Sequence, residues 1–536
     1  MSTNGENPIP AGGGLFGQLL QLSRESVIYG LSSAASQIVG FFLIPLYTHY
    51  LTTDQYGVLE ILNTTLPLLA IIFTMGLTAA LFRTYFKYQD DASRRKVAST
   101  ILVFLTVTSA LLTGLLLLLA GHFSTLIFHS SDYAMDFRLV FLTLFFNTGS
   151  AIAFSVFRAR RQPTRYALAS IAQFLISITL NIVFVIGLHT GIRGILEGNL
   201  IASALVYLPL TANLVKQCGL RLSTLDLKEM LAFGLPLVPA ALGGWILVMA
   251  DRYFLQFLST PDQVGLYSLG YKFGLVIQAM VVGPIQLAWL PFLFSAAKGK
   301  ESGRMYSRIF TYYILVILPI ALAISVLSRE VLAIMAEPSY YDAYKVIPMI
   351  TLSYVLYGCF YMLPVGINLE AKTKYLALLV GGAAILNLGL NYALVPGHGM
   401  MGSAVATLIC YALLPVGAYF ISRRYLRVDY EWIRITKIIV AAAVIYAASL
   451  FAGRSYPLVH SHVTVGAFKL LILLTFPGLL YLLGFYRREE ISKARELIGL
   501  SPAYAQSILR WGFRRLSGSR EKPNSNEIDH DETQKP

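Results

Sequence analysis

The stretch that decides the fold runs from Thr52 to Leu59 and reads TTDQYGVL, and it returns from Ser259 to Leu266 as STPDQVGL. Several further residue pairs share nearly the same spacing, namely Tyr166 with Tyr375, Asn181 with Asn391, Gly191 with Gly399 and Gly194 with Gly402. Matches at one spacing indicate two copies of one unit. Because both copies lie in hydrophobic sequence, they are typical of a duplicated membrane bundle, the architecture in which transporters build a site between two halves.

The composition predicts a membrane protein. Of the 536 residues, 56% are hydrophobic and 13% are charged, and the mean hydropathy is +0.64. Apolar runs of about 20 residues recur along the chain, each long enough to span about 30 Å of hydrocarbon as a helix. The alternation typical of transmembrane strands is absent. We therefore predict an all-α polytopic membrane protein.

We expect about fourteen transmembrane helices, six in each copy and two appended after the second. The predicted spans are Val27–Tyr50, Val58–Phe82, Val97–Ala120, Leu139–Phe157, Ala167–Leu188, Ile195–Val215, Met230–Leu258, Gly265–Phe294, Tyr306–Ser325, Val346–Leu369, Tyr375–Val395, Gly402–Ile421, Ile438–Phe451 and Val463–Tyr486.

The domain boundaries follow from these spans. We expect a polar N-terminal segment over residues 1–22, an N-lobe with helices 1–6 over 23–216, a cytoplasmic linker over 217–229, a C-lobe with helices 7–12 over 230–425, the appended helices 13–14 over 426–486, and a cytoplasmic tail over 487–536. The tail is amphipathic as far as Leu516, which favours contact with the membrane surface, and polar beyond it, which is typical of disorder.

The charge of the loops predicts orientation. Most of the 42 lysines and arginines fall on alternate connections and in the C-terminal tail. Since cytoplasmic loops are enriched in Lys and Arg, we expect both termini in the cytoplasm. The net charge of +14 is then a topological signal, and we expect no nucleic-acid partner.

The sequence lacks the motifs of several enzyme classes. It contains no Walker GxxxxGK[ST] motif and no HExxH motif. Cys218, Cys359 and Cys410 lie far apart, without a metal-ligand spacing. No predicted external loop is long enough to carry a folded active site. We therefore expect a protein that is not an enzyme and holds no cofactor or metal.

Charged residues within the predicted spans are the candidates for a binding site, because a charge in hydrocarbon costs at least about 2.5 kcal/mol. Arg252 and Lys272 lie on consecutive antiparallel spans at similar depths, roughly 10 Å from the outer ends. Together they predict an anion site in a central cavity, with Asp251 holding Arg252. The alternative is that both side chains extend to the lipid headgroups.

Other charged residues carry two interpretations. Glu60 either pairs with a cation or proton, as Asp251 could, or caps its helix N-terminus. Arg24 and Arg83 lie at inner helix ends, where they either meet phosphate from the cytoplasm or anchor the helices. Lys469 lies in an appended helix outside the repeat, so we expect it to tolerate alanine. The glycines and prolines within Gly265–Phe294 predict a bend in that span.

The order of several short motifs resembles a known family. In the first copy these are SVIYG over residues 26–30, FLIPLY over 42–47 and LTTDQYG over 51–57; in the second they are DRYFL over 251–255, GLYS over 265–268 and GYKFG over 270–274. From Ser23 to Tyr486 the chain is similar to bacterial Wzx-type polysaccharide-biosynthesis flippases, in the superfamily that also contains lipid II flippases and multidrug and toxin exporters.

The resemblance implies two six-helix lobes facing each other in a V, two appended helices and alternating access. It implies a bacterial cytoplasmic membrane and an undecaprenyl-pyrophosphate-linked oligosaccharide as substrate, flipped for O-antigen, capsule or exopolysaccharide synthesis. Membrane lipids, a polysaccharide polymerase and a chain-length regulator are the partners implied. Unlike lipid II flippases, the chain lacks basic residues within its first two spans, which argues against a peptidoglycan role.

Two other function classes stay open. An ion-coupled exporter of small amphiphilic molecules would need buried carboxylates for organic cations, whereas a flippase needs buried cations for phosphate. Arg252 and Lys272 favour the flippase over the exporter. A scaffold for envelope glycan enzymes, without transport of its own, is the third class.

Overall fold

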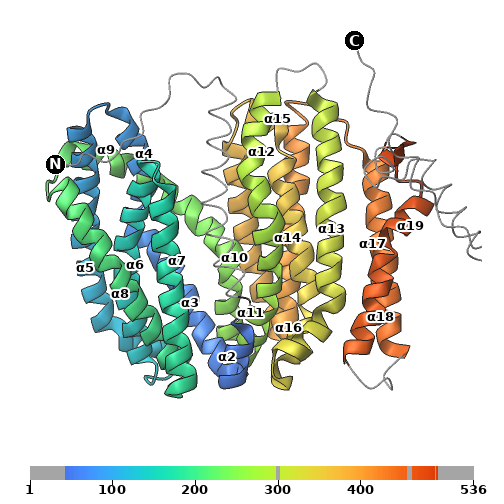
Figure 1. Cartoon of the computed structure of the whole chain (residues 1–536), viewed down its shortest axis with the longest axis horizontal. Helices are drawn as coiled ribbons and strands as arrows, with labels where there is room; N and C mark the ends of the chain where they lie inside the picture. Colours follow the sequence, from blue (N-terminus) through green and yellow to red (C-terminus); the bar gives the residue numbers. More distant parts are fainter. Residues whose placement is uncertain (1–40, 42, 297–301, 456–461, 489, 493–536) are drawn as a thin grey trace, which may run out of the picture. The chain divides into compact units, whose positions relative to one another are not determined.

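The computed structural model describes residues 41, 43–296, 302–455, 462–488 and 490–492. These residues form helices joined by short connections (Figure 1). The chain divides into two compact units, Met1–Leu474 and Thr475–Pro536. Arg24, the N-terminal segment and the amphipathic part of the tail, beyond its first few residues, lie outside the described residues.

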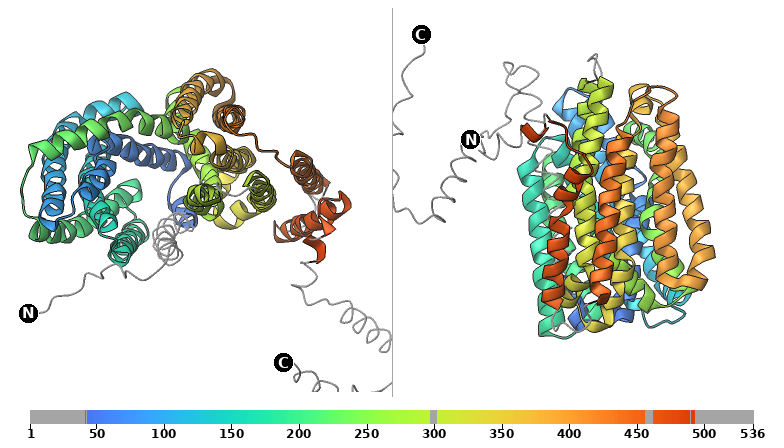
Figure 2. Two further views of the ribbon diagram at one scale, coloured as in Figure 1. Left: turned by 90° about the horizontal axis from the view of Figure 1, so that it is seen from above. Right: turned by 90° about the vertical axis from the view of Figure 1, so that its right-hand side faces the viewer.

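The first copy of the repeat forms the N-lobe within the first unit. Its helices are α2 (Ile44–Tyr50), α3 (Thr53–Thr74), α4 (Leu77–Lys87), α5 (Asp91–Phe128), α6 (Ala134–Ala159), α7 (Pro163–Ile182), the π-helix η1 (Val183–Gly187) and α8 (Gly191–Cys218). Helix α6 packs between α5 and α8, and α7 packs against α8. The long helices run side by side along one direction (Figure 2).

The second copy and the first two appended helices complete this unit. They are α9 (Thr224–Gly234), η2 (Leu235–Leu237), α10 (Val238–Leu258), α11 (Pro261–Ile277), η3 (Gln278–Val282), α12 (Gly283–Ala296), α13 (Ser302–Met335), η4 (Pro338–Lys345), α14 (Ile347–Met362), α15 (Val365–Leu369), α16 (Lys374–Ser422), α17 (Trp432–Ser455) and α18 (His462–Leu474). Helix α16 packs against α10 and α14, and α13 packs against α14, α17 and α18. The second unit contributes α19 (Phe476–Leu482).

The predicted spans coincide with these helices. In the described part of the chain, 11 helices are long and apolar enough to cross a membrane, or up to 12 if the bent pair η4 and α14 counts as one span. Helix α16 contains two predicted spans, separated at Gly399, where the φ angle of 52° breaks the helix. The first predicted span lies mostly outside the described residues, and only its end appears, as α2.

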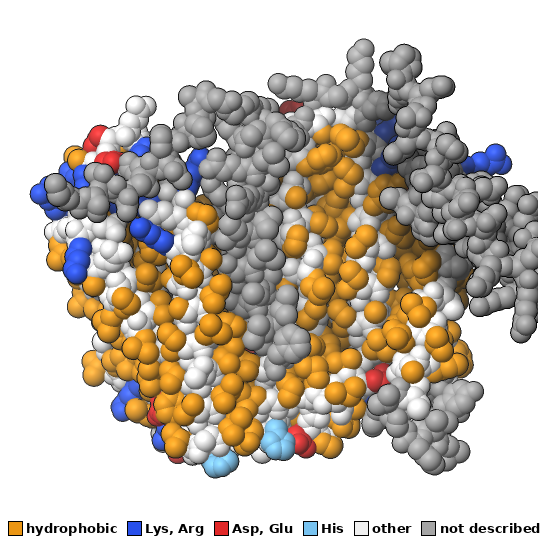
Figure 3. All heavy atoms as spheres, in the orientation of Figure 1, with side chains coloured by type: hydrophobic (Ala, Val, Ile, Leu, Met, Phe, Trp, Pro, Cys, Tyr) orange, Lys and Arg blue, Asp and Glu red, His pale blue; other side chains and the backbone are white. Residues whose placement is uncertain are grey.

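Apolar side chains cover the faces of these helices. Leu111, Leu118 and Ile385 are more than two-thirds exposed, as expected of residues that face lipid. Figure 3 shows an apolar band with Lys, Arg, Asp, Glu and His gathered at its two rims. The chain is therefore a multi-pass membrane protein of all-α architecture.

The seventh span belongs to both lobes. Its first part, α9, packs against α4 and α5, and Met230 is buried in the N-lobe core. A Cβ at Gly76 would overlap the carbonyl of Gly234, so the two backbones touch. The part of this span that packs on α4 and α5 therefore ends at the Leu235–Leu237 turn, where Pro236 interrupts the helix. The predicted lobe boundary at residue 230 stays a prediction.

The eighth span changes its hydrogen-bonding pattern in the middle. Helix α11 ends at Ile277, a π-helical turn follows over Gln278–Val282, and α12 begins at Gly283. Such π-helical turns occur frequently at functional sites. This turn ends before Gly283 and Pro284, and the bend predicted for this span stays a prediction.

Candidate functional site

The two copies of the repeated motif begin two helices in the same way. Thr52 Oγ1 accepts a hydrogen bond from Gln55 N at 3.3 Å, and Gln55 Oε1 accepts one from Thr52 N at 3.2 Å. In the second copy Thr260 Oγ1 accepts from Gln263 N at 3.4 Å. Each threonine is an N-cap. The repeated sequence is therefore a repeated helix start.

These two helices bring the lobes together. Helix α3 of the N-lobe packs against α11 and α10 of the C-lobe. Thr65 and Tyr253 share a hydrogen bond of 2.7 Å between their hydroxyls, and Trp245 Nε1 donates to Thr64 O at 3.3 Å. The candidate residues of α10 and α11 thus lie where the two copies meet.

Lys272 is paired across this contact. Its Nζ lies 3.2 Å from Glu60 Oε1, and the side chains are 21% and 13% exposed. The ammonium also lies 4.9 Å from the ring centre of Tyr56 and 5.8 Å from that of Tyr47, where the ring faces attract a cation. Glu60 therefore does not cap its helix, since Thr52 and Gln55 do; it holds Lys272.

Arg252 lies against the rings of two tyrosines. Its Cζ lies 4.2 Å from the ring centre of Tyr271 and 5.6 Å from that of Tyr267, and its Nη1 donates to Val248 O at 2.6 Å. The residue is 4% exposed. A guanidinium has five N–H donors, and within the described part of the chain this hydrogen bond is the one it makes. The remaining donors are therefore suited to the oxygens of an anion.

Asp251 does not hold Arg252 as the sequence led us to expect. Its carboxylate accepts three hydrogen bonds, from the Tyr267 hydroxyl at 2.6 Å, Thr407 Oγ1 at 2.7 Å and Asn391 Nδ2 at 2.8 Å. Asn391 Oδ1 in turn accepts from Ser403 Oγ at 2.7 Å. This fully buried network joins α10, α11 and both halves of α16, and its oxygens are the kind that take a proton or a hard cation.

The predicted residues at the inner ends lie apart from this cluster. Arg83, on α4, stacks on the ring of Phe233 of α9, with 4.8 Å from Cζ to the ring centre. It lies 23 positions after Glu60, across the end of α3 and the start of α4, which corresponds to roughly 35 Å of helix. The structure therefore groups Glu60, Asp251, Arg252 and Lys272 near one end of the spans and leaves Arg83 near the other.

Sequence reasoning missed the tyrosines. Tyr267 and Tyr271 stand four residues apart on α11, a spacing that places both rings on one face of a helix. The motif YSLGY therefore contained the signal. Thr407 gave no such signal. It lies 156 residues from Asp251 along the chain, so its hydrogen bond to Asp251 depends on how α16 packs against α10.

Comparisons with known proteins agree with the fold. The model of the family described as polysaccharide biosynthesis protein matches residues 22–297. A protein of the Lsg locus of Haemophilus influenzae is 24% identical over 297 residues, which cover 53% of this chain and 68% of that protein.

Two solved structures share the architecture. The lipid II flippase MurJ in an inward closed conformation matches with a TM-score of 0.69 and 14% identity, over 85% of this chain and 99% of that one. An inward-facing multidrug resistance MATE family transporter matches with a TM-score of 0.59 and 15% identity, over 74% and 94%. Both are named as transport proteins and neither as an enzyme.

Proposed function

Because this chain belongs to the family of polysaccharide biosynthesis proteins, we propose that it flips an undecaprenyl-pyrophosphate-linked oligosaccharide across the bacterial cytoplasmic membrane. The oligosaccharide moves from the inner to the outer leaflet by alternating access, for the synthesis of a surface polysaccharide. Both termini lie in the cytoplasm, which places the Thr52 end of α3 near the outer face. A polymerase and a chain-length regulator use the product.

The observation that carries this proposal is the pair of cations where the lobes meet, of which Arg252 is buried and Lys272 partly buried. Arg252 is enclosed by Tyr267 and Tyr271, and Lys272 by Tyr56 and Tyr47. A pyrophosphate needs charge-assisted hydrogen bonds in a site from which water is largely excluded. Arg252 supplies planar N–H donors and Lys272 a mobile point charge.

The ion pair of Lys272 with Glu60 would couple substrate binding to the contact between the lobes. While the lobes are in contact through α3 and α11, the Glu60 carboxylate is paired with the Lys272 ammonium. Pyrophosphate would compete with Glu60 for Lys272, and the displaced carboxylate would then take up a proton or another cation. The Asp251 network, close to Arg252 in sequence, is the second place where a proton or cation would couple to transport.

Complementation of a strain that lacks its own flippase tests this function. Arg252→Ala and Lys272→Ala should each strongly reduce surface polysaccharide, whereas Lys272→Arg should retain part of it. Lys345→Ala is the matched control, since Lys345 makes an exposed ion pair with Asp342. Membrane levels of every variant are measured in parallel. Normal export by a well-expressed double variant, Arg252→Ala with Lys272→Ala, would refute the anion site.

One observation favours the ion-coupled exporter. Asp251 is a fully buried carboxylate, the type of group that attracts an organic cation. The same strain, exposed to toxic organic cations, separates the two functions. Resistance that depends on Asp251, without any effect of Arg252→Ala on polysaccharide, would favour the exporter.

A further inference from the structure

We propose that a polar pocket in the N-lobe, between the first turns of α3, α6 and α8, binds a sugar unit of the transported oligosaccharide. The pocket is distinct from the Arg252 and Lys272 site. This inference rests on the proposed function, which places the pocket on the outer face. It would act as an exit subsite that holds the glycan after its pyrophosphate has left the cations.

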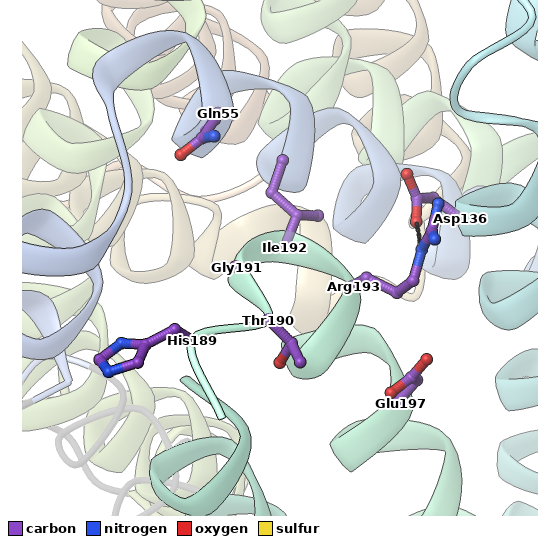
Figure 4. A pocket seen from close by; sticks show the side chains of 8 residues that line it. All are labelled: Gln55, Asp136, His189, Thr190, Gly191, Ile192, Arg193 and Glu197. Atoms are coloured by element: carbon purple, nitrogen blue, oxygen red, sulfur yellow. Dashed lines mark ion pairs between the residues drawn. The ribbon is translucent and has the colours of Figure 1, made fainter. Parts of the chain in front are cut away.

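The pocket is built by side chains from three helices and one turn. Gln55 comes from α3, Asp136 from α6, and Arg193 and Glu197 from α8, with His189, Thr190, Gly191 and Ile192 forming the turn before and at the start of α8 (Figure 4). Its volume is about 510 Å³, within the range of sites that bind small molecules.

Asp136 and Arg193 form an ion pair in the lining of the pocket. Asp136 is 5% exposed and lines the pocket. Its Oδ1 lies 3.5 Å from Arg193 Nε. The Arg193 side chain is 53% exposed, so this pairing leaves guanidinium N–H groups available to a ligand.

The lining selects for a sugar. Carboxylates, the amide oxygen and the Thr190 hydroxyl, which already donates its proton to Phe184 O, accept hydrogen bonds, whereas the Arg193 guanidinium and the amide nitrogen donate them. Sugar hydroxyls do both, so they match such a mixture. The lining carries two carboxylates, Asp136 and Glu197, and one guanidinium, Arg193, so its net charge is negative and repels a phosphate. The pocket therefore differs in ligand preference from the site of Arg252 and Lys272, and it favours a neutral sugar or an amino sugar.

The second copy of the repeat shows that the fold does not require these charges. Gly191 and Gly399 begin the same turn in the two copies, with φ angles of 61° and 52°. In the second copy, 208 residues further on, Met401 and Val405 replace Arg193 and Glu197. The second copy therefore builds the same turn without the charged pair.

The two equivalent glutamines also differ. In the second copy Gln263 Oε1 accepts a hydrogen bond from Met400 N at 3.0 Å, which ties the helix start to the turn. In the first copy Gln55 Oε1 is used by its own helix cap. In the first copy Gln55 therefore does not bind the turn and lines the pocket instead. A charged pair that only one of two copies carries is not required by the fold, so we infer that it serves a ligand.

The position of the pocket links it to the contact between the lobes. Gln55 is two residues from Gly57, whose backbone touches α11. A sugar bound against Gln55 would therefore lie beside the part of α3 that must separate from α11 when the outer side opens.

Thiol labelling in whole cells tests the occupant. The natural cysteines are buried, so Thr190→Cys and His189→Cys serve as two independent reporters for a membrane-impermeant maleimide. His398→Cys is the control, because His398 is exposed and occupies the position of Thr190 in the second copy. We expect at least one pocket reporter to react several-fold more slowly in cells that make the lipid-linked oligosaccharide than in cells that cannot. The control should react equally in both.

Two further arms define the ligand. In cells without the polymerase, persisting protection identifies the lipid-linked unit as the occupant, and lost protection identifies the polymer. Glu197→Gln should abolish the protection and lower export several-fold, whereas Asp342→Asn, which neutralises an exposed carboxylate outside the pocket, should do neither.

The outcomes separate this inference from the proposed function. Equal reactivity of both pocket reporters in cells where the same variants export glycan would overturn the pocket and leave the flippase intact. If the control His398→Cys reacts with maleimide as slowly as the pocket reporters, the inference is also overturned, because closure of the whole outer side would then explain the protection. Normal export by Glu197→Gln would overturn it as well. If the unmodified chain restores no surface polysaccharide, the proposed function itself fails.

Discussion

Gly57 of α3 and Gly265 of α11 lie backbone to backbone where the two copies of the repeat meet. A Cβ on Gly57 would overlap the carbonyl oxygen of Pro261, and a Cβ on Gly265 would overlap that of Thr53. The two glycines occupy equivalent positions in the repeated motif, 208 residues apart. The lobes are therefore in contact through the same part of the same motif, used twice.

Gly57→Ala should separate the lobes at this end, because the added methyl group meets backbone atoms, which cannot rotate away. We expect a longer and broader distance between spin labels at Asp132→Cys and Asp342→Cys, two exposed positions in different lobes. Gly114→Ala in α5 is the control, since nothing lies within 4 Å of its added Cβ. An unchanged distance distribution with Gly57→Ala would show that the contact yields without opening.

Glu60→Gln should destabilise the purified protein by about 1–3 kcal/mol, less than the loss of one partner from a fully buried pair. The ammonium of Lys272 would keep its tyrosine rings but lose its counter-charge. Thermal unfolding in detergent measures the effect, and Glu60→Gln with Lys272→Met should recover most of it.

The control for this prediction is Glu337→Gln. Glu337 pairs with His49 at 2.8 Å, but both side chains are largely exposed, so its loss should cost less than about 1 kcal/mol. Equal losses for Glu60→Gln and Glu337→Gln would mean that burial does not strengthen the Lys272 pair.

Lys469→Ala should be strongly destabilising, contrary to the tolerance that the sequence led us to expect. Lys469 Nζ lies 2.6 Å from Glu330 Oε1 and donates to Val326 O at 3.2 Å, and both side chains are about nine-tenths buried. Removing one partner from a buried pair leaves an uncompensated charge, which costs about 3–5 kcal/mol.

The export assay should separate this stability effect from a role in transport. We expect Lys469→Ala to lower membrane levels and export together, while Lys469→Met with Glu330→Gln restores both. A double variant at full membrane level that still fails to export would place this ion pair in the substrate path.

Acid should loosen the first turn of α5 through Asp90. Asp90 Oδ2 accepts a hydrogen bond from Ser93 N at 2.7 Å, and this bond holds the pKa of the carboxyl below its ordinary value. The stabilisation is present above the unfolded pKa of about 3.9 and is lost as the pH falls through the lowered folded value. Hydrogen exchange at the start of α5 should accelerate in that window.

Asp90→Asn is the matched variant for this prediction. Asparagine also caps helices but does not titrate, so the acceleration in acid should disappear while the turn stays capped. An equal acid response in Asp90→Asn would assign it to another group.

The sequence by itself determined the elements of this protein. Hydrophobic run lengths marked the spans, because a helix must be about 20 residues long to cross the hydrocarbon. The repeat marked the equivalent helices, and the glycines and prolines within Gly265–Phe294 predicted a bend, since such residues restrict or release backbone angles locally. Each of these properties depends on neighbours along the chain, so local sequence is sufficient to predict it.

Only the tertiary structure decided the partners of the charged residues. Glu60 and Lys272 lie 212 residues apart in sequence. Asp251 accepts hydrogen bonds from Thr407 and Asn391, which lie on another helix. Sequence placed Arg252 and Lys272 at one depth but could not show that tyrosines enclose them or that Lys469 is buried. Rotation and contact of helices depend on how side chains from distant segments fill the space between them, and that packing is a property of the whole bundle.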